Sequence, residues 1–520
     1  MIQTLLQRCF DPQMGARGFL VARWLFLRAL GLIYFSAFYS LLFQIKGLIG
    51  PQGILPAGNY LRAIAQYYGA TAWRHAPSLF WLSSSSAAMM TVTWLGIAAS
   101  LLVFANVWPR LTLFVCWICF LSFVTSSSDF SSYQSDGMLL EAGFIALFFA
   151  PPGIWPGFAG KSPPSWASLW LLRWEWFRIY FESGLVKELS GDPQWRNLTA
   201  MDEYYQNSPL PTWIGWYVQH LPHWFHAASV VGTLAMEFVL VFMLFFPRRV
   251  RLICFLIVTP WEIGVILSGN YAFLNYIVLA LGFLLLDDGY LVRVIPARWR
   301  PAVLEGGEPA RGVRGVMQVA GVVFSACMLT WVGYVTTAKL LDIAGPRVLP
   351  LEPAIPLEPF RIANQYGLFA VMTRGRYEIE FQGSNDGENW QPYLFTHKPQ
   401  LVNEAPRIYA PYQPRWDWNL WFASLGDWQQ NDIVPLAEEK LLMNDRDVAG
   451  LFRSDPFGNS APRYVRAVLW QYWFTSMEEK RRTGNWWRRE MLGLYAPAIE
   501  RTPDGQFEIF APPDILPRHD

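Results

Sequence analysis

Long apolar runs recur through the first 340 residues or so of the chain and then stop. Each run approaches or reaches the roughly 20 residues that a helix needs to cross a hydrocarbon layer about 30 Å thick. About nine runs are present, at residues 20–44, 87–107, 109–126, 136–152, 166–188, 226–246, 250–268, 270–286 and 315–338. This recurrence predicts a polytopic α-helical membrane protein.

The charge content of the chain agrees with this class of protein. Only 16% of the 520 residues are charged, against about 25% in soluble globular domains. The formal net charge is +1 and no strongly basic region stands out, so we expect membrane lipids and no nucleic acid among the partners.

Basic residues between the runs orient the predicted spans, because lysine and arginine concentrate in cytoplasmic loops. A nine-span arrangement with the N-terminus inside and the C-terminus outside puts the following residues in the cytoplasm: Arg8, Arg17, Arg23, Arg110, Lys161, Arg248, Arg249, Arg251, Arg293, Arg298, Arg300, Arg311 and Arg314. The segment 125–136 has no lysine or arginine and falls outside. Segments 45–86, 189–225 and everything after about 340 fall on the same non-cytoplasmic side.

The sequence changes character after the last apolar run. We therefore predict a membrane domain at 1–345 and a β-rich soluble domain at 346–520, beginning with a stiff proline-rich linker at 347–359. Residues 376–395 indicate two short strands around an Asn/Asp/Gly turn. Apolar and polar residues alternate from Tyr377, which is typical of a half-buried strand.

The fifth run carries more charge than a spanning helix usually tolerates. Glu175, Arg178 and Glu182 share one helical face at i, i+3 and i+7. We expect them to form an intramembrane polar seam facing other helices or a hydrated cavity. The full seam that we predict is Glu141, Glu175, Arg178, Glu182, Glu237 and Glu262. Such a seam either joins helices or handles a substrate.

Lys187 lies near the non-cytoplasmic end of the same run. A partly desolvated lysine can act as a general base. Alternatively, Lys187 extends to the interface or pairs with Glu188.

Two other motifs are compatible with chemistry but favour structural roles. Cys116 and Cys119 have the spacing of a redox dithiol, yet they lie mid-span, where thiolate is disfavoured and packing cysteines are expected. His220, His223 and His226 have zinc-compatible spacing, but a proline interrupts them and no further ligand is fixed by sequence. We expect no metal and no cofactor.

Several long, ordered stretches resemble the lipase maturation factor family of polytopic membrane proteins. They are residues 27–57, 133–152, 171–213, 409–426, 464–475 and 486–490. The resemblance implies a membrane-embedded folding or maturation factor for a secreted or exported client. In animal members the client is a secreted homodimeric lipase, and the C-terminal domain faces the lumen of the endoplasmic reticulum.

The resemblance also implies a client-binding surface on the non-cytoplasmic face. It would combine the β-rich domain with segments 45–86 and 189–225. Within the 409–426 stretch, the residues that we expect to bind client are Tyr409, Pro411, Trp416, Trp418 and Trp421. No cysteine follows Cys327, the loops are short, and the last residues carry no retrieval signal. These features favour a bacterial plasma membrane, or the endoplasmic reticulum membrane if the chain is eukaryotic.

A fainter resemblance connects the fifth run to the membrane region of vitamin K-dependent carboxylases. Tyr180, Phe181, Gly184 and Lys187 match the outline of the motif in those enzymes, with a one-residue difference in the spacing from glycine to lysine. The alternative function that this implies is an intramembrane enzyme acting on a lipid-like or quinone-like molecule. Lys187 would be its base, tuned by Glu182 or Arg178.

Overall fold

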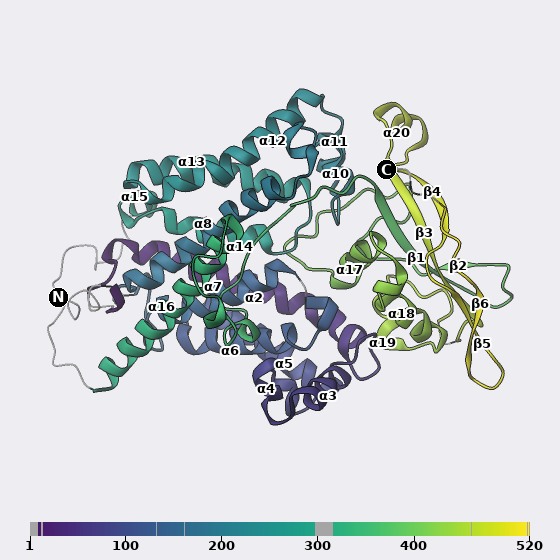
Figure 1. Cartoon of the computed structure of the whole chain (residues 1–520), viewed down its shortest axis with the longest axis horizontal. Helices are drawn as coiled ribbons and strands as arrows, with labels where there is room; N and C mark the ends of the chain where they lie inside the picture. Colours follow the sequence, from purple (N-terminus) through teal and green to yellow (C-terminus); the bar gives the residue numbers. More distant parts are fainter. Residues whose placement is uncertain are drawn as a thin grey trace.

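Helices form one long bundle, and a sheet with its own helices covers one end of that bundle (Figure 1). The computed structural model describes residues 9–11, 14–131, 133–160, 162–296, 316–458, 460–516 and 518. Six of the basic residues used above to predict orientation lie outside these residues: Arg8, Lys161, Arg298, Arg300, Arg311 and Arg314.

Each predicted apolar run contains a helix. The helices are α2 (Leu20–Ile49), α5 (Ser86–Phe104), α6 (Pro109–Val124), α7 (Gln134–Phe149), α8 (Trp166–Leu189), α12 (His223–Phe238), α13 (Arg248–Ser268), α14 (Leu274–Gly282) and α16 (Val316–Ala344). Among the described residues, five helical segments are long and apolar enough to cross a membrane: Arg17–Ile49, Ser86–Phe104, His223–Phe245, Arg248–Ser268 and Val319–Ala344. These segments confirm the membrane class, whereas nine crossings remain a prediction.

Shorter helical elements lie before, between and after these helices. The short α-helices are α3 (Ala57–Tyr68), α4 (Ala72–His75), α9 (Pro193–Arg196), α10 (Tyr204–Asn207), α11 (Trp213–Gln219) and α15 (Asp288–Val294). The 3₁₀ turns are η2 (Arg17–Phe19), η3 (Gly69–Thr71), η4 (Leu79–Trp81), η5 (Ser128–Ser131), η6 (Leu240–Phe245), η7 (Phe283–Leu285), η10 (Glu352–Ala354), η11 (Glu358–Phe360) and η12 (Trp428–Gln430).

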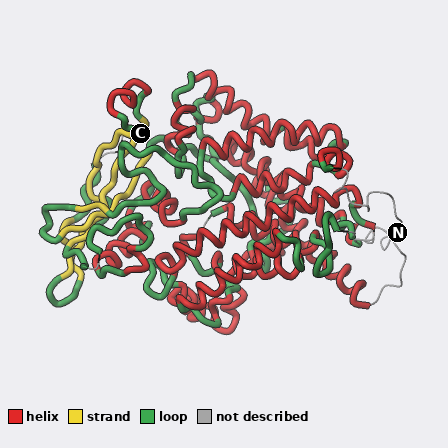
Figure 2. Tube along the Cα trace, turned by 180° about the vertical axis from the view of Figure 1, so that it is seen from behind, coloured by secondary structure: helices red, strands yellow, loops and turns green. Residues whose placement is uncertain are grey.

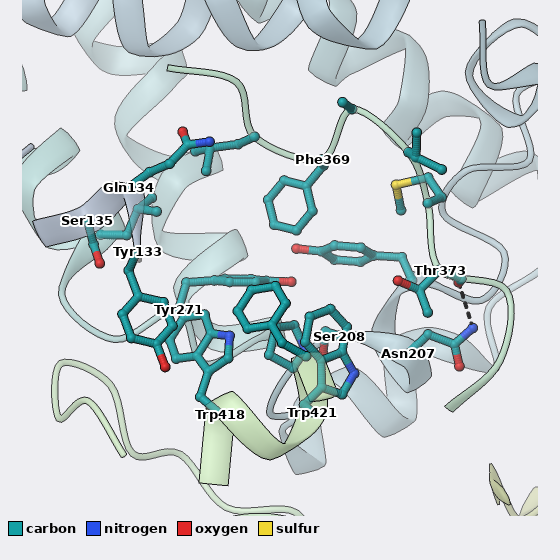
Figure 3. A pocket seen from close by; sticks show the side chains of 18 of the residues that line it. Tyr133, Gln134, Ser135, Asn207, Ser208, Tyr271, Phe369, Thr373, Trp418 and Trp421 are labelled. Carbon is teal, nitrogen blue, oxygen red and sulfur yellow. Dashed lines mark hydrogen bonds between the residues drawn. The ribbon is translucent and has the colours of Figure 1, made fainter. Parts of the chain in front are cut away.

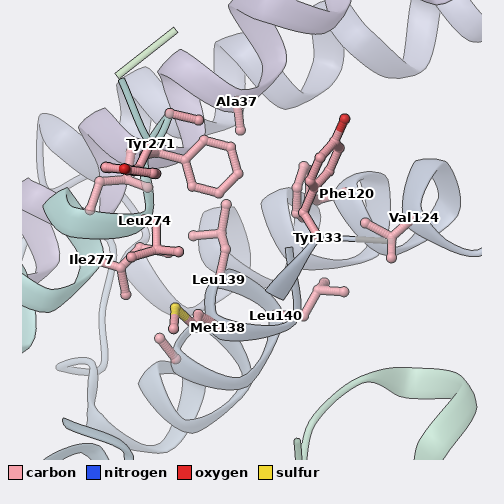
Figure 4. Packing of buried hydrophobic residues seen from close by; sticks show 14 of the residues in the cluster. Ala37, Phe120, Val124, Tyr133, Met138, Leu139, Leu140, Tyr271, Leu274 and Ile277 are labelled. Atoms are coloured by element: carbon pink, nitrogen blue, oxygen red, sulfur yellow. The ribbon is translucent and has the colours of Figure 1, made fainter. Parts of the chain in front are cut away.

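The interior of the bundle is filled by aliphatic and aromatic side chains (Figure 4). Phe120 of α6, Leu139 of α7 and Ile277 of α14 are fully buried there. Gly31 brings α2 against α5, because a Cβ at this position would lie 2.9 Å from the backbone nitrogen of Phe104. Close packing of this kind, with small residues at helix contacts, is what holds helices together in lipid.

Several of the segments predicted to be cytoplasmic contact one another at one end of the bundle. At the end away from the sheet, the Asp288 carboxylate accepts the backbone N–H groups of Leu20 (2.7 Å) and Val21 (2.9 Å). Arg23 donates there to the carbonyl of Ala159 (2.8 Å). Segments predicted to share the cytoplasmic side therefore do meet at one end.

The C-terminal region contains an antiparallel sheet. Its strands are β1 (Arg376–Ser384), β2 (Gln391–Pro392), β3 (Tyr464–Phe474), β4 (Trp487–Leu494), β5 (Ala498–Arg501) and β6 (Phe507–Ala511). The strand order is β2-β1-β3-β5-β6, and β4 also pairs with β3. The β-rich character and the strand–turn–strand at 376–395 are both confirmed.

The prediction that β1 is half buried is wrong. Every residue of β1 is buried, including Glu378 and Glu380 on its polar face. That face is covered because Lys398 donates to Glu378 and Arg489 donates to Glu380. A charged strand face can be buried when each carboxylate has a cationic partner.

Helical segments lie between the sheet and the bundle (Figure 1 and Figure 2). They are α17 (Arg415–Ser424), α18 (Ile433–Leu442) and α19 (Arg446–Ala449), while α20 (Met477–Thr483) lies between β3 and β4 in the chain. Helix α17 packs against β1, and α19 packs against α2 of the bundle. The two domains therefore share a packed junction.

The proline-rich segment after α16 does not hold the domains apart. Trp331 donates its indole N–H to the carbonyl of Pro353 (2.8 Å), and the Tyr334 hydroxyl donates to the carbonyl of Pro350 (3.0 Å). The segment thus folds back along α16. The residues that follow, 361–373, which we call the strap, enter the junction.

Candidate functional site at the domain junction

The charged face of α8, which we predicted to be turned towards other helices or a hydrated cavity, lies against α7. Arg178 makes an ion pair with Glu141 of α7 and lies 3.9 Å from Glu182, four residues further along α8. Glu175 is fully buried on the same helix. We call Glu141, Glu175, Arg178 and Glu182 the bundle cluster.

The strap completes the bundle cluster. Backbone N–H groups of Asn364 and Tyr366 donate to Glu141 (2.8 Å) and Glu182 (2.6 Å), and the Tyr366 hydroxyl donates to Glu141 (2.9 Å). Arg178 donates in return to the carbonyl of Asn364 (2.8 Å). Sequence reasoning missed the strap; its only signal was a polar Asn-Gln-Tyr triplet after the proline-rich segment.

The other two carboxylates of the predicted seam have different partners. Glu237 of α12 accepts from Lys187 (2.6 Å). Glu262 of α13 accepts from Asn275 (2.9 Å) and from the Tyr180 hydroxyl (3.2 Å). The structure therefore divides the six predicted seam residues into the bundle cluster and separate contacts of Glu237 and Glu262.

Lys187 is engaged as a cation. Its ammonium donates to Glu237 and to the carbonyls of Leu368 (2.9 Å) and Ser183 (3.3 Å), which uses all three of its N–H donors. A general base needs a neutral amine with an accessible lone pair. The predicted alternative pairing is also absent, since Glu188 pairs with Arg196 (2.7 Å) at the surface.

Gly184, part of the carboxylase-like outline, has a packing role. A Cβ at this position would lie 3.0 Å from the Cβ of Glu237 and equally close to the Phe238 ring. The glycine therefore lets α8 approach α12. Together with the engaged Lys187, this leaves the enzyme hypothesis without support from the site.

The cysteine pair, His220 and His226 occupy packed positions, whereas the His223 side chain is 61% exposed and contacts Asp202 (2.9 Å). Cys116 and Cys119 are buried free thiols. His220 contacts the carbonyls of Trp216 (2.7 Å) and Thr475 (3.0 Å), so it joins α11 to the C-terminal domain. Within the part of the chain that the structure describes, no group of three His, Cys, Asp or Glu side chains is arranged to hold a metal ion.

Helix α17 anchors the C-terminal domain to the bundle. Arg415 makes a bidentate pair with Asp136 at the start of α7, at 2.7 and 2.8 Å. Trp416 is fully buried, and Trp418 and Trp421 are nearly so. Of the predicted client-binding residues, only Tyr409 and Pro411 are partly exposed; their stretch is fixed by Asn270, whose side-chain oxygen accepts from the Tyr409 N–H (2.6 Å).

A cavity of about 400 Å³ lies in the junction. The strap residue Phe369 lies on one side of it, and Tyr271, Trp418 and Trp421 lie on the other (Figure 3). A second cavity of about 100 Å³ reaches Lys187 and shares Tyr271 and Phe369 with the first. The volume of the first is within the range of about 300–1,000 Å³ that ligand pockets occupy.

Comparison with known proteins covers both domains. Residues 21–293 match the sequence model described as the lipase maturation factor transmembrane domain, and residues 362–497 match the lipase maturation factor C-terminal domain. The second match includes most of the strap, so the segment that closes the bundle cluster belongs to the C-terminal region of these proteins.

The chain is also similar to curated proteins along most of its length. It is 30% identical to lipase maturation factor 1 of Bos taurus, covering 94% of this chain and 91% of that protein. It is 31% identical to lipase maturation factor 2 of Gallus gallus, covering 95% and 84%, and 30% identical to lipase maturation factor 1 of Homo sapiens, covering 92% and 88%. No solved structure matches the chain.

Proposed function

Because the chain belongs to the lipase maturation factor family, we propose that it is a membrane-embedded factor that assists the folding or assembly of a secreted or exported lipase-like client. The observation that carries this proposal is the similarity over 92–95% of the chain to relatives named for lipase maturation. The packed junction between the domains adds support, because it presents the C-terminal domain as a fixed platform at one end of the bundle.

The client would meet this platform on the non-cytoplasmic side. Arg248 and Arg251 lie at the start of α13, where Arg248 pairs with Asp287 (3.2 Å), the residue before α15; α15 lies at the end of the bundle opposite to the sheet (Figure 1). Basic loops favour the cytoplasm, so the C-terminal domain would face outward from a bacterial plasma membrane, or into the lumen of the endoplasmic reticulum. Nine crossings with the N-terminus inside satisfy this arrangement.

The client-binding surface would include the exposed part of the 409–426 stretch. Tyr409 and Pro411 are partly exposed, and the neighbouring Ile408 exposes 39% of its surface. Trp416, Trp418 and Trp421 would support this surface from beneath, because they are buried against the bundle and the sheet.

Co-expression with a lipase tests the proposed function. In cells that lack their own maturation factor, we expect the wild-type chain to raise the specific activity of a secreted lipase. Ile408→Glu should abolish most of that gain without lowering the amount of the factor. The matched control is Ile509→Glu, on the exposed strand β6, which should retain the gain. Lipase activity that is independent of the chain contradicts the proposal.

Orientation is tested separately by fusing reporters to the C-terminus in bacteria. We expect an active alkaline phosphatase fusion and a dark fusion of green fluorescent protein exported through the Sec pathway. The reverse pattern would contradict the outward orientation while leaving the membrane class intact.

A further inference from the structure

The segment between α2 and α5 exposes large aromatic and aliphatic side chains. Its helices α3 and α4 project from the flank of the bundle opposite to α12 and α13 (Figure 1). Tyr67, Trp73 and Leu82 expose 81%, 55% and 87% of their surface. The Tyr68 ring joins the two helices, because it contacts both Tyr67 and His75 (ring centroids 4.7 and 3.7 Å apart). We call residues 57–82 the α3–α4 segment.

Hydrogen bonds fix the end of the α3–α4 segment beside the membrane helices. The Thr125 hydroxyl donates to the carbonyl of Pro77 (3.0 Å). The Ser78 hydroxyl donates to the carbonyl of Ser122 (3.0 Å), in the last turn of α6. Leu82 then precedes the first residue of α5 by four positions. Because α5 is long and apolar enough to cross a membrane, the segment lies where the chain enters the bilayer.

The outward face of α5 is apolar. Trp94, Leu95 and Leu102 expose 55%, 49% and 41% of their surface, and side chains of this kind on a spanning helix face the acyl chains. The acyl-chain layer therefore begins within a few residues of Leu82. Aromatic residues are enriched at the headgroup level that borders this layer, which is the level of the α3–α4 segment.

The exposed charge of the α3–α4 segment is positive. Arg62 and Arg74 are exposed, and Arg74 lies over the Trp73 ring (5.2 Å). Within the part of the chain that the structure describes, neither guanidinium makes an ion pair with a carboxylate. The sequence itself has no acidic residue between Asp11 and Asp129. The two cations are therefore free to meet an anionic partner.

We propose that the α3–α4 segment binds the headgroups of anionic phospholipids at the end of the bundle that carries the C-terminal domain. Arg62 and Arg74 contact the lipid phosphates. Tyr67, Trp73 and Leu82 enter the layer between the headgroups and the acyl chains. Short helices that combine aromatic and basic side chains are typical of this layer, and each basic residue strengthens the attraction to an anionic surface. This contact is independent of the identity of the client.

A client protein fits the same surface less well. It would need an acidic surface that reaches the level of Leu82, where α5 enters the bilayer. The phosphates of a bilayer already lie at that level and carry the complementary charge. Charge and position together therefore favour a lipid surface as the partner of the α3–α4 segment.

Fluorescence quenching of the full-length chain in lipid nanodiscs tests this proposal. A nitrobenzoxadiazole label is attached at Ala70→Cys, an exposed position between α3 and α4. The background is Cys9→Ser with Cys327→Ser, which removes the free cysteines that are not buried. The nanodiscs contain phosphatidylcholine and phosphatidylglycerol, and one lipid or the other carries a spin label near the ester end of an acyl chain. We expect quenching by both lipids, about twofold stronger with spin-labelled phosphatidylglycerol at equal mole fraction.

Two matched double variants separate anionic binding from general lipid contact. Arg62→Gln combined with Arg74→Gln should make quenching by the two lipids equal. Arg463→Gln combined with Arg501→Gln makes the same charge change at exposed positions of the sheet, and should keep the twofold difference.

Three results overturn the proposal. The first is equal quenching by the two lipids in the chain that carries only the label and its background changes, or no quenching by either. The second is loss of the difference in both double variants. The third is benzoylphenylalanine at position 67 that captures a co-expressed lipase and no lipid.

Discussion

Two buried charge clusters in this molecule have opposite imbalances. The bundle cluster has three carboxylates, Glu141, Glu175 and Glu182, around the single cation Arg178. On β1 the corresponding group, which we call the sheet cluster, has an excess of cations. It consists of Arg376, Glu378, Glu380, Lys398 and Arg489.

Each imbalance is relieved across the domain junction. The carboxylates of the bundle cluster accept N–H and O–H groups from the strap at Asn364 and Tyr366. In the opposite direction, Arg376 of the sheet cluster donates to the carbonyls of Gln206 (3.0 Å) and Ser208 (2.5 Å), in the segment between α8 and α12. Burial lowers the pKa of Arg376, and Glu378 opposes that shift.

The comparison shows why the two domains form one body. Buried charges need partners, because their desolvation is costly, and neither cluster has enough partners within its own domain. The bundle cluster needs donors and the sheet cluster needs acceptors. Separating the domains would therefore leave the charged groups of both clusters exposed or without partners. The junction is thus held by polar complementarity as well as by aromatic packing.

The largest loss of folding stability is expected from Arg178→Ala. It leaves three buried carboxylates without their cation, and breaking a buried pair in this way typically costs about 3–5 kcal/mol. Chemical denaturation of the purified protein in lipid nanodiscs measures this loss.

The matched control is Arg196→Ala, at the surface end of the same region. Arg196 and Glu188 are 61% and 57% exposed, and exposed pairs contribute about 1 kcal/mol or less. Equal losses for the two variants would show that the bundle cluster is not a stabilising element.

A smaller effect is expected from Lys398→Met in the sheet cluster. Glu378 keeps Arg376 as its partner, so the loss is that of the Lys398 hydrogen bonds to Glu378 and to the carbonyl of Ile379, about 1.5–3 kcal/mol. Limited proteolysis should show earlier cleavage in the C-terminal domain than in the bundle. Simultaneous cleavage of both would show that the sheet cluster stabilises the whole junction.

Tyr366→Phe should cost about 1.5 kcal/mol, the low end of the range for a hydrogen bond to a charged group. It removes one donor from Glu141, which keeps its contacts with Arg178 and the Asn364 N–H. Hydrogen exchange of residues 361–373 is the sensitive measurement, and exchange should become faster there. Tyr334→Phe removes a hydroxyl that donates at an exposed carbonyl and serves as the control. Unchanged exchange in Tyr366→Phe would contradict the role given to the strap.

The smallest change in the free energy of unfolding, measured near pH 5, is expected from Glu438→Gln on α18. Burial raises the pKa of Glu438 well above its usual 4.5, so the folded protein keeps a proton that the unfolded chain releases. Wild-type stability should therefore fall as pH rises from about 4.5 towards the folded pKa. Glu438→Gln should lack this fall, and thermal melts from pH 5 to 8 measure the difference. Parallel pH profiles of variant and wild type would contradict the assignment.

Sequence patterns predicted local features well. The apolar runs indicated every long helix, and helical spacing put Glu175, Arg178 and Glu182 on one buried face. These sequence patterns did not reveal the strap, whose contacts with α7 and α8 join residues more than 180 positions apart. Period-two alternation placed Glu378 on the polar face of β1, but could not show that Lys398 would cover that face.

By itself, the sequence determined that this chain forms a helical membrane domain followed by a β-rich domain, and that it belongs to the lipase maturation factor family. These properties follow from hydropathy, periodicity and long similar stretches, all of which are local in the chain. Only the tertiary structure decided which cation meets which carboxylate, and that Trp418 and Trp421 line a cavity between the two domains. Those outcomes depend on which helices and strands pack together, because hydrogen bonds and ion pairs are set by distances between residues far apart in sequence.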